Sequence, residues 1–185
     1  QSFFSDASED LLVVPGFVAS DEKQNTTTLG RGGSDYTAAI IGAALNASVV
    51  EIWTDVSGMM TADPRMVSNA KAIKQISYHE AMELSHFGAK VIYPPTIQPV
   101  MRKNIPVWIK STFAPEHHGT LIENTSGKNT SNVRGISSIN KIALLSLEGS
   151  GMAGIPGFSK RLFETLANEQ INVILITQSS SEHSI

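Results

Sequence analysis

Residues 26–39 read Thr-Thr-Thr-Leu-Gly-Arg-Gly-Gly-Ser-Asp-Tyr-Thr-Ala-Ala, a polar, glycine-rich turn that runs into an apolar helical pattern. Ser34 is a suitable N-cap, and the apolar spacing that follows predicts a helix starting near Asp35. The glycines allow the backbone to approach a ligand closely, and a helix N-terminus offers unpaired N–H groups. Arg31 adds a planar cationic fork suited to a carboxylate or a phosphate. The turn therefore predicts a site for an anionic small molecule.

Spacing excludes two familiar glycine-rich loops. Asp35 stands where the dinucleotide-binding fingerprint places its third glycine, and no Lys-Ser or Lys-Thr pair follows as a P-loop requires. Taken alone, the turn is also compatible with an ordinary strand-to-helix connection, in which the glycines only relieve steric crowding and Arg31 lies in solvent.

The composition describes a globular chain without a strong electrostatic character. The chain has 185 residues, 41% of them apolar, a formal net charge of −3 and no cysteine. A real core is therefore possible, whereas disulfides and thiolate metal sites are excluded. There is no run of Lys or Arg, and no apolar run reaches the ~18 residues of a membrane span. We expect no nucleic-acid partner, no membrane partner and a cytoplasmic location.

Both ends of the sequence look cut. The chain lacks an initiating Met and has neither the basic start nor the long apolar core of a signal peptide. Its last predicted strand, at 171–178, is followed almost at once by the final residue. We expect a fragment of a longer protein.

Strand and helix patterns alternate along the chain. Apolar or β-branched runs at 11–14 and 49–54 flank the helix near Asp35, which gives the order of a βαβ unit and implies a parallel sheet. Ligands of such sheets bind beyond the carboxyl ends of the strands, where Thr54 and Asp55 emerge. We therefore expect these two residues to lie close to the glycine-rich turn.

A loop over 54–65 follows, marked by Ser-Gly and Asp-Pro pairs. It is not a calcium loop, because Met66 occupies the position that needs a bidentate glutamate. Asp55 and Asp63 are compatible with simple turn capping. Arg65, a cation at the same edge of the predicted sheet, is suited to meet phosphate.

The stretch Ser77-Tyr-His-Glu80 matches a capping box and predicts a helix that continues to about residue 88. His79, Glu83 and His86 share one face of this helix. The metalloprotease pattern requires His where Glu83 stands, so a solvated polar face is favoured and no metal site is predicted. Lys90 lies just past the helix end, either on the surface or directed into the ligand cleft.

A helix at 96–104 and strands at 105–110 and 119–122 complete the first unit, and a polar linker or long loop follows. Beyond it, a glycine-rich turn and a helical face separate strands predicted at 141–148 and 171–178. This second βαβ unit has too few strands to bury its own faces, so it must pair with more chain or with another subunit.

Five motifs occur in the order found in the aspartate kinases of the amino-acid kinase family. They are residues 27–35, 52–58, 61–65, 87–91 and 119–122. The chain resembles these enzymes from about Val13 to its end. Residues 174–182 are similar to the first ACT-type regulatory unit of threonine-sensitive members, which include enzymes fused to homoserine dehydrogenase.

The resemblance implies an α/β fold, the C-terminal part of an amino-acid kinase domain with a largely parallel sheet flanked by helices, followed by an ACT-like βαβ unit. The implied domains are residues 1–124 for the kinase part, 125–138 for a linker and 139–185 for a truncated regulatory domain.

The resemblance also implies a reaction, transfer of the ATP γ-phosphoryl group to the side-chain carboxylate of L-aspartate to give 4-phospho-L-aspartate. A carboxylate with a pKa of about 4 is ionised at neutral pH, so no general base is needed. The enzyme must instead align two anions and supply positive charge at the transferring group. ATP is the co-substrate, Mg²⁺ arrives with the nucleotide, and the protein itself holds no metal.

The site residues carried over from the family fall into two groups. Aspartate binding is implied for Arg31, Gly32, Gly33, Ser34 and Asp35, with Arg31 on the α-carboxylate. ATP binding is implied for Thr54, Asp55, Met60, Arg65, Lys90 and Val91. Lys90 and Arg31 are the implied catalytic residues, because they would bracket the two anionic reactants.

Two features depart from the family pattern. Met60 stands where the family often has Tyr, so nucleotide contact there would be apolar or through the backbone. The phosphate-gripping Lys-Phe-Gly-Gly-Thr/Ser segment is absent from the sequence. We therefore expect these 185 residues to be inactive alone.

Effector binding is implied for Met152, Gly157, Phe158, Val173, Gln178 and Ser179. Ile174 stands where lysine-inhibited relatives carry an acidic residue, and an apolar side chain cannot pair with an ε-ammonium group, which favours threonine as effector. ACT units also imply a homo-oligomer. Two alternatives stay open: a regulatory module that only binds an effector, and another amino-acid kinase such as one acting on glutamate.

Overall fold

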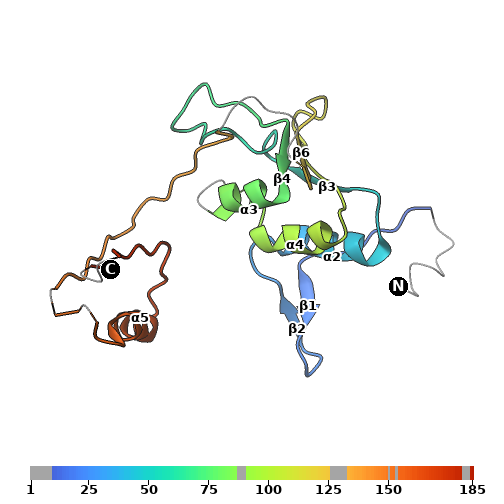
Figure 1. Cartoon of the computed structure of the whole chain (residues 1–185). Coiled ribbons are helices and arrows are strands. Elements are labelled where there is room, and N and C mark those ends of the chain that lie inside the picture. Colours follow the sequence, from blue (N-terminus) through green and yellow to red (C-terminus); the bar gives the residue numbers. More distant parts are fainter. Residues whose placement is uncertain (1–9, 87–90, 126–132, 150, 153, 181–183) are drawn as a thin grey trace. The chain divides into compact units, whose positions relative to one another are not determined.

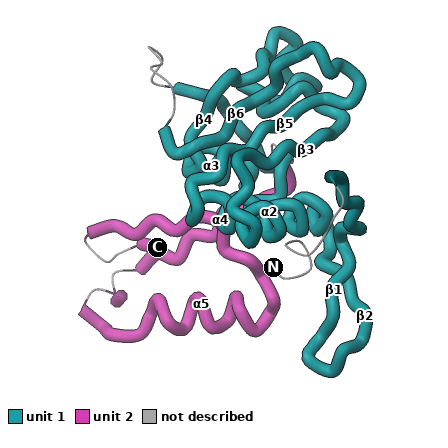
Figure 2. Tube along the Cα trace, turned by 90° about the vertical axis from the view of Figure 1, so that its right-hand side faces the viewer, with its two compact units in different colours: residues 1–139 teal, residues 140–185 magenta. Residues whose placement is uncertain are grey.

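The computed structural model describes residues 10–86, 91–125, 133–149, 151–152, 154–180 and 184–185. The chain divides into two compact units, residues 1–139 and 140–185, which we call unit 1 and unit 2 (Figure 2). No helix among the described residues is long and apolar enough to cross a membrane.

A four-stranded sheet is the centre of unit 1, with strand order β3-β5-β6-β4 (Figure 2). The strands are β3 Val50–Thr54, β4 Gln75–Ser77, β5 Val107–Ser111 and β6 Thr120–Glu123. The pairs β3–β5 and β4–β6 are parallel, whereas β5 and β6 are antiparallel. Every second residue of β5 is buried, as expected for strands that pack one face against a core.

Three helices, all among the described residues of unit 1, pack with this sheet: α2 Gly33–Leu45, α3 Tyr78–His86 and α4 Pro94–Arg102. The core between them includes Ile52, Ile97 and Ile122. Tyr78 is buried in this core, and its hydroxyl donates a hydrogen bond to the Ile105 carbonyl oxygen at 2.7 Å. On the other face of the sheet, the Lys110 ammonium lies 5.2 Å from the centre of the Trp53 ring.

Helix α2 begins earlier than the sequence predicts, and the prediction that Ser34 is its N-cap is wrong. The N-cap is Gly32, in the left-handed conformation with φ of 74° and without a side-chain cap hydrogen bond. Glycine adopts this conformation without a Cβ penalty, so the helix can start inside the turn. The Ser34 hydroxyl instead lies 3.4 Å from the Asp35 carboxylate.

Residues 11–14 do not form the predicted buried strand. Leu11 and Val13 are 81% and 90% exposed. Instead β1, Val18–Ser20, pairs antiparallel with β2, Thr26–Thr28, in a hairpin that the sequence did not predict. An apolar run becomes a strand only beside a neighbour that accepts its backbone hydrogen bonds, and no described strand pairs with 11–14.

The capping box of α3 is confirmed. The Ser77 N–H donates to Glu80 Oε2 at 2.9 Å, and the Glu80 N–H donates back to Ser77 Oγ at 3.2 Å. The helix predicted at 96–104 and the strands predicted at 105–110 and 119–122 are also confirmed, with their ends displaced by one or two residues as α4, β5 and β6.

In unit 2 the predicted helix is confirmed as α5, Phe158–Asn168. The strands predicted at 141–148 and 171–178 are not formed. Glu148, at the end of the first, makes an isolated bridge with Ser184, which lies beyond the second. Leu144 and Leu175, one from each predicted strand, are 96% and 84% exposed. Two strands and one helix bury too little surface to hold a sheet together.

Candidate functional site

The glycine-rich turn lies at the carboxyl end of the parallel strands β3 and β5. Helices α2 and α4 each lead back into one of these strands, so both helices begin at that end of the sheet (Figure 1). The two helix starts are in contact, because a Cβ atom placed on Gly32 would lie 2.3 Å from Tyr93 Cβ. The rings of Tyr36 and Tyr93 meet edge to face, 6.4 Å between centres. The turn is thus held against the segment that begins α4.

The turn presents backbone and charge outward. Gly30 and Gly32 both have positive φ, 73° and 74°, a conformation that side chains rarely adopt. The Gly33 N–H closes the turn by donating to the Gly30 carbonyl oxygen at 3.0 Å. Arg31 and Ser34 are exposed, whereas Gly33 is buried. This arrangement leaves the Arg31 guanidinium able to reach a bound anion.

Asp35 is the half-buried carboxylate of the first turn of α2. Burial raises the pKa of Asp35, and the hydrogen bond from Ser34 lowers it by less. A cation bound beside this group would oppose the effect of burial and return the pKa of Asp35 toward its ordinary value. The site therefore offers one cationic and one anionic side chain on the same turn, a pattern suited to a zwitterion.

Three residues of the second group, Asp55, Met60 and Arg65, lie on the loop over 55–73, which follows Thr54 at the end of β3 and returns to β4. At its start, the Thr54 hydroxyl lies 3.1 Å from Asp55 Oδ1, and the Thr54 carbonyl oxygen accepts from the Thr112 N–H at 2.9 Å. Further along, Met60 forms an isolated antiparallel bridge with Ala72. These bonds give the loop a fixed course at both of its ends.

Arg65 is engaged with Asp63. Its guanidinium forms an ion pair with the Asp63 carboxylate at 2.7 Å, while 86% of the Arg65 side chain is exposed. Hydrogen bonds from Arg65 lower the pKa of Asp63, and the same pair raises the pKa of Arg65. Exposed ion pairs are weakly held, so a phosphate group could draw the arginine away from its partner.

Lys90 lies outside the described residues. Val91 is the first described residue after it, and Val91 is half-buried against the core of unit 1. The chain then reaches Tyr93, which contacts Gly32. The described residues therefore bring the turn of Arg31 next to the segment that follows Lys90.

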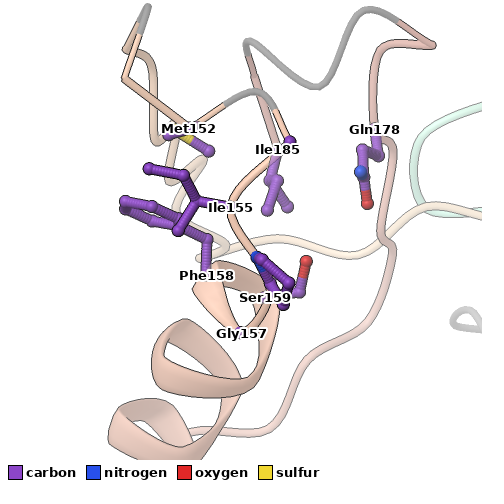
Figure 3. Close-up of a pocket in the computed structure, with 9 residues that line it drawn as sticks. Met152, Ile155, Gly157, Phe158, Ser159, Gln178 and Ile185 are labelled. Atoms are coloured by element: carbon purple, nitrogen blue, oxygen red, sulfur yellow. The ribbon is translucent and has the colours of Figure 1, made fainter.

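Unit 2 contains a pocket of about 310 Å³ at the start of α5 (Figure 3). The residues that line it are Met152, Gly154, Ile155, Pro156, Gly157, Phe158, Ser159, Gln178 and Ile185. Four predicted effector residues, Met152, Gly157, Phe158 and Gln178, are among them. Val173 and Ser179 are not, and the Ser179 N–H donates to the Ser184 carbonyl oxygen at 3.0 Å.

The pocket has an apolar side and a polar side. Figure 3 shows Ile155 and Phe158 opposite the Gln178 side chain, with Ser159 between them at the helix start. The sequence did not single out Ser159 or Ile185. For Ser159 the available signal was its place in the first turn of a predicted helix, where a hydroxyl and free N–H groups coincide.

The described residues contain no group of three or more His, Asp or Glu side chains that could hold a metal ion. The face of α3 that carries His79 and Glu83, both exposed, is therefore not part of such a group among the described residues.

Comparison with models of protein families identifies the family to which most of unit 1 belongs. The amino acid kinase family model matches residues 3–111. The chain belongs to the amino acid kinase family. A model of the ACT domain matches residues 145–185, so the predicted α/β fold class, a kinase part followed by an ACT part, is confirmed.

This amino acid kinase chain is 47% identical to the bifunctional aspartokinase/homoserine dehydrogenase of Haemophilus influenzae over 179 residues. The match covers 97% of this chain and 22% of that protein.

The structure is similar to the R-state of Escherichia coli aspartokinase III in complex with aspartate and ADP, with a TM-score of 0.73 and 42% sequence identity. That match covers 91% of this chain and 38% of the other. It also resembles the T-state of the same enzyme in complex with lysine and aspartate, with a TM-score of 0.68, 42% identity and coverage of 91% and 37%. The predicted resemblance to aspartate kinases is therefore confirmed. The chain spans about a fifth of the length of the bifunctional relative.

Proposed function

We propose that this chain is part of an aspartate kinase, which transfers the γ-phosphoryl group of ATP to the side-chain carboxylate of L-aspartate. The observation that carries the proposal is the contact of Gly32 with Tyr93. It joins the anion-binding turn to the segment after Lys90, at the end of the sheet from which Thr54 and Asp55 emerge. The similarity to an aspartokinase structure with aspartate and ADP supports the same reaction.

In this proposal the glycine-rich turn holds aspartate. The Arg31 guanidinium pairs with the α-carboxylate in a bidentate manner, and the N–H groups of Gly32 and Ser34 lie at the helix start, where they favour an anion. Gly33, whose N–H is bonded to the Gly30 carbonyl oxygen, contributes by letting the substrate approach the backbone closely. Asp35 is the one acidic residue in the stretch 26–39. In this proposal its carboxylate faces the α-ammonium group of the substrate. Both charges of the backbone part of the substrate then have a partner.

The loop over 55–73 holds ATP. Thr54, Asp55 and Met60 line the nucleotide side, and Arg65 exchanges Asp63 for a phosphate oxygen. Lys90 and Val91 complete the set, with the Lys90 ammonium at the phosphates. Mg²⁺ bound to the nucleotide would supply further positive charge there.

The reaction itself needs alignment rather than proton transfer. An oxygen of the ionised substrate carboxylate forms a bond to the γ-phosphorus while the bond to the bridging oxygen breaks, and ADP leaves with that electron pair. Arg31 and Lys90 offset the repulsion between the two anions as they approach. No residue of the chain has to act as a general base.

A second site belongs to the same proposal. We infer that the pocket of unit 2 binds threonine as a feedback effector, with the apolar side against the threonine methyl and Gln178 and Ser159 as hydrogen-bond partners. Lysine is the competing effector, because one related structure is a complex with lysine. Calorimetry with both amino acids on the full-length protein distinguishes them, and tight binding of lysine alone would overturn the assignment.

Product analysis tests the kinase proposal. The full-length protein is incubated with ATP and either L-aspartate or L-glutamate, and the acyl phosphate is trapped with hydroxylamine. We expect aspartyl hydroxamate and no glutamyl product. A glutamyl product would indicate another amino-acid kinase, and threonine binding without phosphoryl transfer would indicate an effector module. Residues 1–185 alone are expected to be inactive, because the family's phosphate-gripping segment is not among them.

A further inference from the structure

A single buried hydroxyl ties the two ends of the loop over 55–73 together. Thr120 Oγ1, at the start of β6, accepts a hydrogen bond from the Met59 N–H at 2.8 Å and donates one to the Ile73 carbonyl oxygen at 2.6 Å. Thr120 and Met59 are both 0% exposed, and Ile73 is 7% exposed. The loop therefore closes on a side chain that belongs to a different strand.

The surrounding backbone is shaped to admit this hydroxyl. Gly58 has a φ of 121°, and a Cβ atom placed on it would lie 2.4 Å from Thr120 Oγ1. Glycine at this position lets the loop come close enough for both hydrogen bonds. The Ile73 N–H also donates to the Met59 carbonyl oxygen at 2.7 Å, so the two loop ends face each other directly.

The hydroxyl is not needed for the strand that carries it. Strand β6 is held by backbone pairing on both sides, Ile109 opposite Thr120 in β5 and Gln75 opposite Leu121 in β4. Loss of the Thr120 hydroxyl would leave this ladder in place. It would leave the Met59 N–H and one acceptor site of the Ile73 carbonyl unsatisfied in a buried place, and the loop would have to open to reach water.

We propose that Thr120 is a positioning residue for the nucleotide, whose hydroxyl holds the loop over 55–73 in the conformation that binds ATP. The inference rests on the proposed function, which assigns Asp55, Met60 and Arg65 of this loop to ATP. Thr120 touches neither substrate in this scheme. It acts by keeping the loop residues presented together, so that binding does not first have to order them.

The test uses Thr120→Val in the full-length protein, because valine has nearly the shape of threonine but can neither donate nor accept a hydrogen bond. Thr120→Ser keeps the hydroxyl. Thr96→Val is the matched control, since Thr96 is also 0% exposed and its hydroxyl has no partner among the described residues. The readouts are KM for ATP, KM for aspartate, kcat, and hydrogen exchange at the Met59 amide.

We expect Thr120→Val to raise KM for ATP by roughly tenfold to thirtyfold, with KM for aspartate and kcat within about twofold, because a buried pair of hydrogen bonds is lost on the nucleotide side alone. Exchange at the Met59 amide should become faster. Thr120→Ser should restore both readouts, and Thr96→Val should change neither.

Equal rises in both KM values, a change in kcat alone, or no recovery in Thr120→Ser would overturn the inference. If Thr120→Val does not fold, Thr120→Cys decides: its weak thiol should raise KM for ATP partially, and an unchanged value would contradict the proposal. If the wild-type protein has no aspartate-dependent kinase activity, the proposed function fails. Hydrogen exchange at the Met59 amide would then still show whether the hydroxyl holds the loop.

Discussion

The two units of the chain differ in whether their apolar strand patterns find a partner. In unit 1 each sheet strand has a neighbour, and Ile109 and Ile122 are 0% exposed. In unit 2 the patterns at 141–148 and 171–178 are just as apolar, yet the described residues form no sheet and α5 has no buried residue. Apolar residues become a core only where a second surface covers them.

This difference separates the two proposed sites. The glycine-rich turn is packed against Tyr93, and the loop over 55–73 is bonded to Thr120 of β6, so both are held by other parts of unit 1. The pocket of unit 2 is built from the start of one helix and a segment without regular pairing. Substitutions in unit 1 should therefore act on chemistry and folding, whereas substitutions in unit 2 should act on regulation.

The largest effect is expected for Arg31. In the full-length protein, Arg31→Ala should lower kcat/KM for aspartate by roughly 100-fold to 1,000-fold, because a bidentate pair with the substrate carboxylate is lost. Arg31→Lys should recover only a small part of this, since an ammonium lacks the planar fork. Arg102→Ala, at the far end of α4, is the exposed control and should leave kcat/KM near wild type. Full activity in Arg31→Lys would show that charge alone is required.

A glycine in each unit tests the structural side of the comparison. A Cβ atom on Gly119 would lie 2.0 Å from the Ile109 carbonyl oxygen, at a φ of 77°, whereas one on Gly151 would meet nothing within 4 Å. Gly119→Ala should lower the free energy of unfolding by about 3 kcal/mol, from steric overlap and backbone strain. Gly151→Ala should change it by less than about 1 kcal/mol. Denaturant unfolding of the full-length variants checks both values, and a large loss in Gly151→Ala would mean that unit 2 is packed more tightly than described.

The sequence predicted best what depends on local contacts. The capping box of Ser77 and Glu80 fixed a helix start correctly because both partners lie within one turn. The start of α2 was misplaced because serine is a common N-cap, whereas the observed N-cap is Gly32, in the left-handed conformation and with Tyr93 packed against it. No pattern in residues 26–39 contains that distant side chain.

The proposed site was likewise predicted only as far as local sequence allows. The motifs indicated the glycine-rich turn and the loop after β3, because glycine and Asp-Pro favour turns whatever the rest of the chain does. Thr120 was missed as a positioning residue because its two hydrogen bonds go to Met59 and Ile73, far away in sequence. The prediction of strands at 141–148 and 171–178 was wrong because an apolar pattern shows that residues favour burial. It does not show whether another part of the chain packs against them.

A smaller effect is expected in the unit 2 pocket. Gln178→Ala should weaken inhibition by threonine about tenfold, because one hydrogen-bond partner of the effector is removed, while kcat without effector stays unchanged. Gln170→Ala, an exposed glutamine outside the pocket, is the matched control. Inhibition assays over a range of threonine concentrations provide the measurement. A fall in kcat without effector would contradict the division of roles between the units.

The smallest effect concerns the start of α3, where both oxygens of Glu80 are used. Oε2 accepts from Ser77, and Oε1 lies 3.4 Å from the Arg134 guanidinium. Burial alone would raise the pKa of Glu80, but the Ser77 hydrogen bonds and the charge of Arg134 outweigh it and hold that pKa below the ordinary value of 4.5. A lowered pKa means that the carboxylate stabilises the fold above pH 4.5, and that this contribution is lost as the pH falls through the lower, folded-state pKa.

Glu80→Ala should therefore lower the free energy of unfolding by only about 0.5–1 kcal/mol at pH 7, a capping-box magnitude kept small because the side chain is partly exposed and screened. Glu83→Ala, an exposed glutamate of the same helix, should have almost no effect. Denaturant unfolding or hydrogen exchange of the first turn of α3, followed from pH 7 down to pH 3, should show the Glu80→Ala difference disappearing below pH 4.5. A difference that persists at pH 3 would mean that Glu80 acts through packing, and that the charge of Arg134 contributes nothing to holding residues 133–139 in unit 1.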